Sequence, residues 1–333
     1  MKNVLITGAS GFIGSFLVEE GLKRNYQVYA GIRKSSNKAF LSDPKINFWM
    51  MDLSDKQKLS EQLTEYKQKG IRFQYIIHNA GATKVLKHDD FYTINTKYTQ
   101  NLVNALIESN SIPDKFIFIS SQEAVGPGDE KNFQPVDENS IPHPISMYGK
   151  SKLQAEHFLT SQRVIPYLIL RPTGVYGPRD QDYTKIIRAA RNGFEIYIKS
   201  TRQHISLIFV KDLAHAVYTA VESNVTGKIF FVSDGQYYTS RDLVKVIKKL
   251  IQKKTIRIVF PGWIIHWIAL INEPVSRLLN RKVLLNTDKF RGLNSMNWLC
   301  DSHTFHKEFK FTPSYDLLKG MTETIQWYEN NKY

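Results

Sequence analysis

The side chains best placed to do chemistry in this sequence are Tyr148 and Lys152, four residues apart, together with Ser121 upstream. Residues four apart on a helix share a face, so the phenol and the ammonium would stand side by side. A nearby ammonium stabilises a phenolate, which predicts that Lys152 lowers the pKa of Tyr148 from about 10 toward the range of an acid–base catalyst. Ser121 could donate a hydrogen bond to a substrate carbonyl or alkoxide. The group predicts proton transfer at an oxygen atom; the alternative is a surface Tyr–Lys pair and a serine that merely ends a strand.

A glycine-rich stretch at residues 8–14 reads Gly-Ala-Ser-Gly-Phe-Ile-Gly and follows the run Val4-Leu5-Ile6-Thr7. Glycines let the backbone turn tightly and approach a pyrophosphate, and the helix that follows presents N–H groups and the positive end of its dipole. An ordinary turn with chance glycines would lack this strand–loop–helix context. The predicted cofactor-binding residues of the loop are Gly8, Ser10, Gly11, Phe12, Ile13 and Gly14.

These residues need a scaffold, and the first half of the chain alternates short β-branched runs with helical patterns. Predicted helices cover 13–24, 91–109 and 147–162. This alternation predicts an α/β fold, a Rossmann-type doubly wound parallel sheet. The predicted strands cover 4–7, 27–32, 47–50, 75–78, 115–119 and 167–170.

The regular alternation breaks after Pro172, then a strand and helix return at 205–221 and another strand at 228–232. From Ser240 onward we expect helix. We therefore predict a nucleotide-binding domain at 1–172 with returning segments near 205–232. A smaller, discontinuous substrate-binding lobe would comprise 173–204 and 233–333.

The glycine spacing, with Thr7 before it and the Tyr148-Gly149-Lys150-Ser151-Lys152 run, resembles the extended short-chain dehydrogenases/reductases, that is, the NAD-dependent epimerase/dehydratase family. The resemblance covers most of the chain. It implies that Lys152 also holds the nicotinamide ribose and that the segment starting at Arg171 faces the nicotinamide and the substrate. It further implies a homodimer through the helices at 91–109 and 147–162. The family's other cofactor contacts match Asp52, Leu53, Asn79, Ala80, Gly81, Asn95, Pro172 and Val175. Asp212 lies in a further landmark of the family and is expected to cap a helix.

The end of the second strand indicates which dinucleotide is bound. NAD-specific proteins usually carry an acid there, which binds the ribose hydroxyls. This sequence has Arg33 and Lys34, and a guanidinium pairs well with a 2′-phosphate. We therefore predict NADP(H), with NAD as the alternative if both residues are only solvated loop residues.

Three reaction classes then compete. We favour a ketone reductase or hydroxy-dehydrogenase, similar to dihydroflavonol reductases and 3β-hydroxysteroid dehydrogenases. A nucleotide-sugar 4-epimerase with bound NAD is the first alternative. A dehydratase is less favoured, because Gln122 stands where the family's dehydratases have an acid, although Glu123 keeps the second acidic position. A protein that only binds cofactor is disfavoured by the complete set of reactive residues.

Composition narrows the class of protein. Hydrophobic residues make up 42% of the 333 residues, and the single cysteine offers no internal disulfide and no metal cluster. The short apolar run at the N-terminus is not a signal-peptide core, so we expect a cytoplasmic protein. The net charge of +14 has no nucleic-acid motif beside it, which favours a basic surface and a small-molecule substrate over a nucleic-acid partner.

The segment from Trp263 to Ile271 is rich in tryptophan and aliphatic residues. Packed core is the interpretation we favour, over a wall or lid of the substrate pocket. A third interpretation, a membrane-surface helix, draws on Arg277, Arg281 and Lys282 nearby, although we expect no membrane partner.

Overall fold

The computed structural model describes the backbone of residues 1–278 and 287–331 and, in helix α9, the side chains as far as residue 272. Arg281 and Lys282, and the side chain of Arg277, lie outside the described residues.

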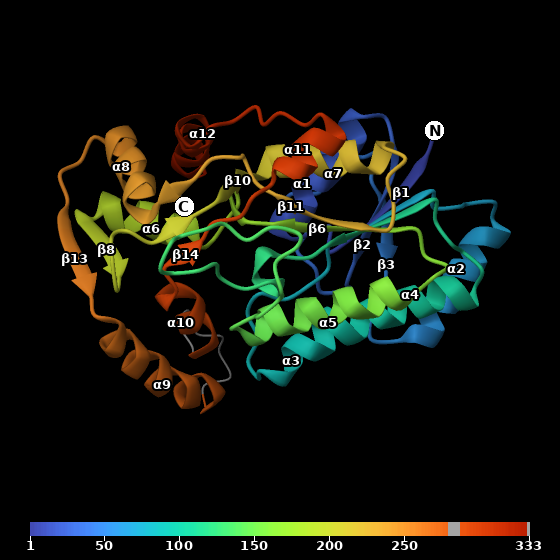
Figure 1. Cartoon of the computed structure of the whole chain (residues 1–333). Coiled ribbons are helices and arrows are strands. Elements are labelled where there is room, and N and C mark those ends of the chain that lie inside the picture. The colour runs from blue at the N-terminus through green and yellow to red at the C-terminus, as the bar shows by residue number, and fades with distance from the viewer. Residues whose placement is uncertain (279–286, 332–333) are drawn as a thin grey trace.

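In the described part of the chain, seven parallel strands form one sheet in the order β11-β6-β5-β4-β1-β2-β3 (Figure 1). Strands β2 and β3 are added on one side of β1, and β4 and the later strands on the other, so the strand order reverses between β1 and β4. Parallel sheets bind ligands at such a switch point, beyond the carboxyl ends of their strands. The predicted fold class is confirmed. The strands are β1 (Asn3–Thr7), β2 (Gln27–Ile32), β3 (Asn47–Met50), β4 (Tyr75–His78), β5 (Lys115–Ile119), β6 (Tyr167–Pro172) and β11 (Lys228–Val232).

Helices cover both faces of the sheet, so most central residues of its strands are apolar and buried on both sides. Along β1, Val4 and Ile6 enter one buried cluster while Leu5 enters the other. The face beside Val4 carries α1 (Phe12–Lys23), α7 (Val210–Glu222) and α11 (His303–Phe309). The face beside Leu5 carries α2 (Lys56–Gln68), α4 (Tyr98–Glu108) and α5 (Met147–Ser161).

Two short irregular elements lie near the carboxyl ends of the strands. Helix α3 (Asp89–Phe91) continues through a π-helical turn, Tyr92–Lys97, into α4. A 3₁₀ turn, Gln122–Ala124, follows β5. The π-helical turn has wider hydrogen-bonded rings than an α-helix, and single π-helical turns often occur at functional sites.

Beyond β6 the chain builds smaller sheets from segments that are far apart in sequence. Strand β7 (Gly174–Tyr176) pairs with β10 (Leu207–Phe209), and β8 (Phe194–Ile198) pairs with β13 (Ile256–Phe260). Strand β9 (His204–Ile205) lies between β12 (Tyr238–Thr239) and β14 (Asn297–Trp298). The helices of this second lobe are α6 (Tyr183–Arg191), α8 (Ser240–Ile251), α9 (Gly262–Leu278), α10 (Thr287–Asn294) and α12 (Leu317–Asn330).

Two expectations from the sequence are wrong, one for this lobe and one for α7. The stretch after Ser240 is not wholly helical, because the β-branched run at 256–260 pairs with β8. Asp212 does not cap a helix: Phe209 is the N-cap residue of α7, and the Asp212 carboxylate accepts the backbone N–H of Ser314 and Tyr315, at 3.0 and 2.9 Å. The buried acid thus joins α7 to the chain that leads into α12.

The Trp263–Ile271 segment forms most of the described part of α9, and the packed-core interpretation fails for most of it. Ile265 and Ala269 are buried, but Trp263 and Trp267 are 67% and 61% exposed. Among the helices that the structure describes, this one included, none is long and apolar enough to cross a bilayer.

Candidate active site

The glycine loop joins β1 to α1, and side chains at Gly8 or Gly14 would collide with nearby backbone atoms. Gly8 has φ +66°, and its carbonyl accepts the Gly11 N–H at 3.0 Å. A Cβ on Gly14 would lie 2.1 Å from that same carbonyl oxygen. Because α1 begins at Phe12, the N–H groups of its first turn border the loop, which fits the cradle that a pyrophosphate requires.

The loop after β4 packs directly against the glycine loop. The Ala80 N–H donates to Thr7 Oγ1 at 3.1 Å, and a Cβ on Gly8 would meet Ala80 Cα at 2.8 Å. Asn79 Nδ2 reaches the Gly8 carbonyl at 3.5 Å. The structure therefore brings the two predicted cofactor loops together at the switch point of the sheet.

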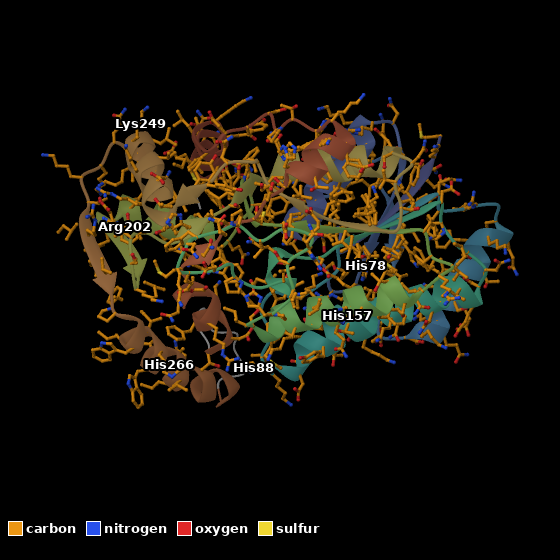
Figure 2. The ribbon with its side chains drawn as sticks, viewed as in Figure 1. His78, His88, His157, Arg202, Lys249 and His266 are labelled. Carbon is orange, nitrogen blue, oxygen red and sulfur yellow. The ribbon has the colours of Figure 1, made fainter. Side chains whose placement is uncertain are left out.

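His78 is a residue of this region that the sequence patterns do not identify. Its imidazole lies between Thr7 Oγ1, at 2.7 Å, and Thr99 Oγ1, at 2.9 Å, and joins β1 and β4 to α4 (Figure 2). Burial lowers the pKa of His78 to about 3, helped by the charge of Lys152, so the ring is neutral. Only the position of a histidine at the end of an otherwise apolar strand could have pointed to it.

The structure brings the side chains of Tyr148 and Ser121 together, with Lys152 about one turn further along α5. Ser146 caps α5 by accepting the Gly149 N–H at 2.9 Å, and this places Tyr148 and Lys152 in the first turns of the helix. The Tyr148 hydroxyl forms a hydrogen bond with the Ser121 side chain. The Lys152 ammonium donates to the Ile119 carbonyl at 2.7 Å, at the carboxyl end of β5. A Cβ on Gly81 would lie 3.6 Å from Lys152 Nζ, so the ammonium also borders the loop after β4.

The electrostatics of this group differ from the expectation. Burial raises the pKa of Tyr148 above its ordinary value, and the Glu123 carboxylate adds to the rise while the hydrogen bond from Ser121 opposes it. The prediction that Lys152 lowers the pKa of Tyr148 is therefore wrong for this arrangement, in which the ammonium is directed at a backbone carbonyl. Burial also lowers the pKa of Lys152 to about 8, against the opposing charge of Glu156.

Asn95 lies in the π-helical turn before α4, and its side chain is fully engaged. Its Oδ1 accepts the Ala82 N–H at 2.7 Å, while Nδ2 donates to the Ala82 carbonyl and to Ser151 Oγ, at 3.1 and 2.9 Å. The amide thus joins the loop after β4 to α5. In this structure the Asn95 side chain therefore fixes the position of the loop after β4 relative to α5.

The chain that leaves β6 runs over the first helix. β6 ends at Pro172, and Val175 in β7 packs against the same apolar cluster as Phe12 and Ile13. The Arg179 guanidinium donates to Ser15 Oγ at 2.9 Å and to Glu19 at 2.6 Å, and lies over the ring of Phe16. The segment that was expected to face cofactor and substrate is therefore anchored on α1.

The predicted adenosine-binding residues lie together at the ends of β2 and β3. Arg33 and Lys34 are exposed directly after β2, and Asp52 is exposed after β3. Hydrogen bonds from Ser54 lower the pKa of Asp52, and the nearby charge of Arg33 contributes. The Leu53 carbonyl accepts from Asn101 Nδ2 at 2.9 Å, which fixes this corner to α4.

Two acidic side chains lie at the start of α5: Glu123, which the sequence singled out, and Asp288, which it did not. Glu123 accepts from Ser146 Oγ at 2.6 Å, and burial raises its pKa, to which Asp288 adds. Asp288, from α10 of the second lobe, accepts the Met147 N–H at 2.5 Å and the Tyr148 N–H at 3.4 Å. The second lobe therefore contacts α5 at its N-terminus, where a carboxylate is favoured by the helix dipole.

A cluster of lysines lies near this contact. Lys84 from the loop after β4, Lys185 from α6 and Lys289 from α10 all pair with Asp182, at 2.8, 2.5 and 3.3 Å. These ion pairs join the sheet to the second lobe beside the site. Nothing in the sequence spacing could have predicted them, because the four residues are spread over more than two hundred positions.

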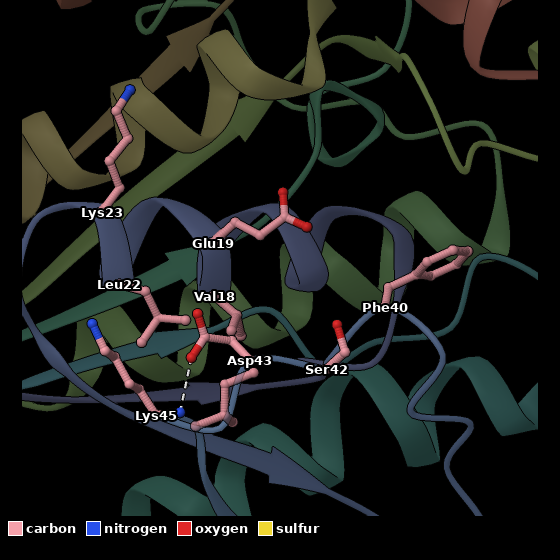
Figure 3. A pocket seen from close by; sticks show the side chains of 9 residues that line it. Val18, Glu19, Leu22, Lys23, Phe40, Ser42, Asp43 and Lys45 are labelled. Atoms are coloured by element: carbon pink, nitrogen blue, oxygen red, sulfur yellow. Dashed lines mark hydrogen bonds between the residues drawn. The ribbon is translucent and has the colours of Figure 1, made fainter. Parts of the chain in front are cut away.

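A pocket of about 320 Å³ lies elsewhere, on the outer side of α1 (Figure 3). Glu19, Lys23, Asp43 and Lys45 give it mixed charge, and Phe40 closes one end. None of the predicted site residues lines it.

Comparisons with known proteins agree with this geometry. The model of the NAD-dependent epimerase/dehydratase family matches residues 4–233. The chain is 26% identical to a sterol-4-alpha-carboxylate 3-dehydrogenase (decarboxylating) of Dictyostelium discoideum, over 97% of this chain and 100% of that protein. It is also 26% identical to a UDP-glucose 4-epimerase of Vibrio cholerae, over 79% and 80% of the two chains. The solved UDP-glucose 4-epimerase of Thermotoga maritima superposes with a TM-score of 0.79 at 21% identity, covering 99% and 100% of the two chains, which supports the fold.

Proposed function

Since the chain belongs to the NAD-dependent epimerase/dehydratase family and is an NAD(P)-dependent enzyme of the extended short-chain dehydrogenase/reductase type, we propose that it is an NADP(H)-linked ketone reductase or hydroxy-dehydrogenase. The observation that carries this proposal is the convergence of Ser121, Tyr148 and Lys152 beside Gly81 at the switch point of the sheet. A nicotinamide dinucleotide bound along the two loops would exchange a hydride with the substrate carbon.

The proton chemistry follows from the state of Tyr148. Its raised pKa keeps the phenol protonated at neutral pH, which suits an acid that gives its proton to the oxygen of a ketone. As the carbonyl carbon gains a hydride, the C=O double bond becomes a single bond and its oxygen takes the Tyr148 proton, forming an alcohol. The hydroxyl of Ser121 would stabilise the charge that develops on that oxygen.

Lys152 has a different task in this arrangement. Its ammonium is held by the Ile119 carbonyl next to Gly81, where it can donate a hydrogen bond to a ribose hydroxyl of the cofactor. Once that ribose lies between the two side chains, the ammonium would also stabilise the phenolate that proton transfer leaves behind. Asn95 and His78 act on the reaction only by positioning the loop after β4 and the ends of β1 and β4.

The preference for NADP(H) rests on the adenosine end of the proposed cofactor path. Arg33 and Lys34 are exposed after β2, close enough to Asp52 for the guanidinium to affect that carboxylate. A 2′-phosphate placed there would meet two positive charges, and the planar guanidinium can bind it with two hydrogen bonds. Asp52 would remain available to the adenine.

A nucleotide-sugar 4-epimerase is the second candidate, favoured by the epimerase relatives that match most of the chain. It would use the same three residues with NAD retained through each cycle. A dehydratase is less favoured, because the buried amide of Gln122 cannot act as a carboxylic acid and Glu123 is engaged by Ser146. The Dictyostelium relative suggests that apolar cyclic ketones should be screened first.

The test is to incubate the full chain with NADPH and a panel of steroid ketones, flavanonols and UDP-hexoses, with analysis of both products. A reductase consumes one NADPH for each alcohol formed. An epimerase interconverts UDP-hexoses with no net change in dinucleotide, and that result would replace the proposed activity with the second candidate.

The predicted homodimer through α4 and α5 is kept as part of this proposal. Light scattering of the purified chain tests it, and a monomer at micromolar concentration would refute it.

A further inference from the structure

One surface of the second lobe combines exposed apolar side chains with positive charge. We propose that this surface, formed by residues 245–272 (the end of α8, β13 and the described part of α9) and here called the Trp263 surface, docks the protein on an anionic lipid bilayer. The proposal is independent of the catalytic activity proposed above.

The helix provides the apolar part. Trp263, Trp267 and Ile271 follow one another at intervals of four residues, so they lie along one side of α9 and are 67%, 61% and 62% exposed. The opposite side holds the buried Ile265 and Ala269, which attach the helix to the protein. Leu270, 40% exposed, adds to the outer side. A helix in the middle of a packed lobe would not leave two tryptophans in water.

The strand that leads into α9 extends the exposed apolar character. Ile256 at the start of β13 is 68% exposed, and its partner in register on β8, Phe194, is 42% exposed. Ile196, two residues further along β8 and on the same side as Phe194, is 48% exposed. The two-stranded sheet therefore presents an aliphatic and aromatic side to solvent.

The positive charge of this surface indicates that its partner is anionic. Residues 245–272 contain Lys245, Lys248, Lys249, Lys253, Lys254 and Arg257 and no aspartate or glutamate. The acid on the paired strand, Glu195, is buried and is engaged by Lys248 and Arg257. In Figure 2, Lys249, Arg202 and His266 are spread along the side of the molecule formed by α8, β13 and α9.

The exposed tryptophan and aliphatic side chains of α9 thus lie on the same side of the molecule as a lysine-rich segment, and this combination is typical of surfaces that bind a membrane interface. Tryptophan favours the headgroup level, and lysines beside it are attracted to phosphatidylserine or phosphoinositides. A second copy of this chain, which carries the same excess of positive charge, would be repelled at this surface. An anionic bilayer complements both properties at once.

The experiment is co-sedimentation of the full chain with vesicles at low salt, either phosphatidylcholine alone or phosphatidylcholine with about one-third phosphatidylserine. We expect the chain to bind the anionic vesicles at least about tenfold more tightly than the neutral ones, and less tightly as salt is added. Tryptophan emission should shift to the blue on binding, because Trp263 and Trp267 leave water.

Two pairs of substitutions locate the contact. Trp263→Gln with Trp267→Gln should lower vesicle affinity about tenfold or more and abolish the blue shift. Lys249→Glu with Lys254→Glu should abolish the preference for anionic vesicles. Ile141→Gln is the matched apolar control, since Ile141 is 85% exposed in a loop outside the surface, and Lys45→Glu is the matched charge control. All variants should bind NADPH like the wild type, which shows that they are folded.

Failure of the wild type to bind anionic vesicles at low salt would overturn the proposal. So would vesicle binding that survives both pairs of substitutions. Self-association that the tryptophan substitutions abolish, without vesicle binding, would assign the surface to a second copy and equally overturn it.

Discussion

The candidate site at the carboxyl ends of the main strands and the outer side of the second lobe differ in how their side chains are held. At the carboxyl ends of the strands, buried hydrogen bonds hold the side chains of the candidate site. Lys152 donates to Ile119, Asn95 bonds to Ala82 and Ser151, and His78 bonds to Thr7 and Thr99. On the outer side of the second lobe, Trp263, Trp267 and Ile256 project into solvent.

The difference shows what each region is suited to do. A site that transfers a hydride and a proton needs groups fixed to within a fraction of an ångström, which buried networks provide. A surface that docks on a bilayer needs apolar area and charge but little fixed geometry. Changes at the carboxyl ends of the strands should therefore affect rate and cofactor affinity sharply, and changes on the outer side of the second lobe should act on stability or localisation.

The largest effect is expected from Tyr148→Phe, which removes the proton donor and leaves the ring in place. Turnover should fall about 10³-fold or more, while NADPH affinity changes by less than about threefold. Steady-state kinetics and fluorescence titration measure the two quantities. Tyr167→Phe, at the opposite end of β6, is the control and should keep full activity. Retained turnover in the Tyr148 variant would remove the tyrosine from the chemistry.

The next largest effect is expected from Gly14→Ala. The added methyl would lie 2.1 Å from the Gly8 carbonyl oxygen, so the loop must move, and cofactor affinity should fall about 100-fold. Gly292→Ala in α10 is the matched control, because its methyl would meet nothing nearer than Trp298 at 3.8 Å. Equal cofactor affinity in both variants would show that the glycine loop is not the cofactor cradle.

Arg33→Ala should weaken NADPH binding about tenfold and leave NADH binding unchanged, since only the 2′-phosphate distinguishes the two. Parallel titrations of both dinucleotides measure this. Arg202→Ala, an exposed arginine of the second lobe, should change neither affinity. A loss of the same size for NADH and NADPH would instead mean that Arg33 contacts a part that both share.

Much of the candidate site could be predicted because each of its motifs occupies a short stretch of the sequence. The glycine loop, the Asn79-Ala80-Gly81 loop and the Tyr148–Lys152 spacing are each contained within a few residues of a strand or helix end. The lowered pKa of Tyr148 was not a sound prediction, since spacing alone does not show that Lys152 donates to a backbone carbonyl. His78 and Asp288 were missed because their partners lie 71 and 141 positions away along the chain.

The second lobe was harder to predict, because its strands pair with segments that are far away in the sequence. Strand β13 forms by pairing with β8, about sixty residues earlier, and its isolated sequence gives no sign of that partner. The exposure of Trp263 and Trp267 was also misjudged, because helical spacing shows that residues share a face but not whether that face is covered.

The pH dependence of the rate and of folding stability offers a further test of the candidate site. The pKa of Lys152 in the folded chain, about 8, lies below the ordinary value of about 10.4 for an unfolded chain, so the folded state releases its proton first. Reduction should therefore slow as pH rises through about 8, whereas this lysine's contribution to folding stability grows between about pH 8 and pH 10.4. Rate profiles and urea unfolding measure the two trends.

Lys115 provides the control for that profile. Burial lowers its pKa to about 8 as well, but it caps the end of α7 through Ala220 and Ser223. Lys115→Met should keep the pH profile of the rate and alter only stability. A rate profile that loses its alkaline limb in this variant would contradict the assignment to Lys152.

The smallest effect is expected at the contact between the two regions. Asp288→Asn weakens the acceptor at the N-terminus of α5, which should cost about 1 kcal/mol of stability and a few-fold in turnover, because Tyr148 lies in that turn. Asp316→Asn is matched to it, since Asp316 caps α12 within the second lobe. It should cost similar stability with unchanged turnover, and equal turnover in both variants would show that the lobes are not coupled there.

The central claim, an exchanging NADP(H) enzyme, is tested most directly by denaturing freshly purified protein, identifying any released dinucleotide, and titrating the unliganded chain with NADPH and NADH. We predict little bound dinucleotide and at least about tenfold tighter binding of NADPH than of NADH. One NAD released per chain would contradict the claim and favour an epimerase that retains its cofactor.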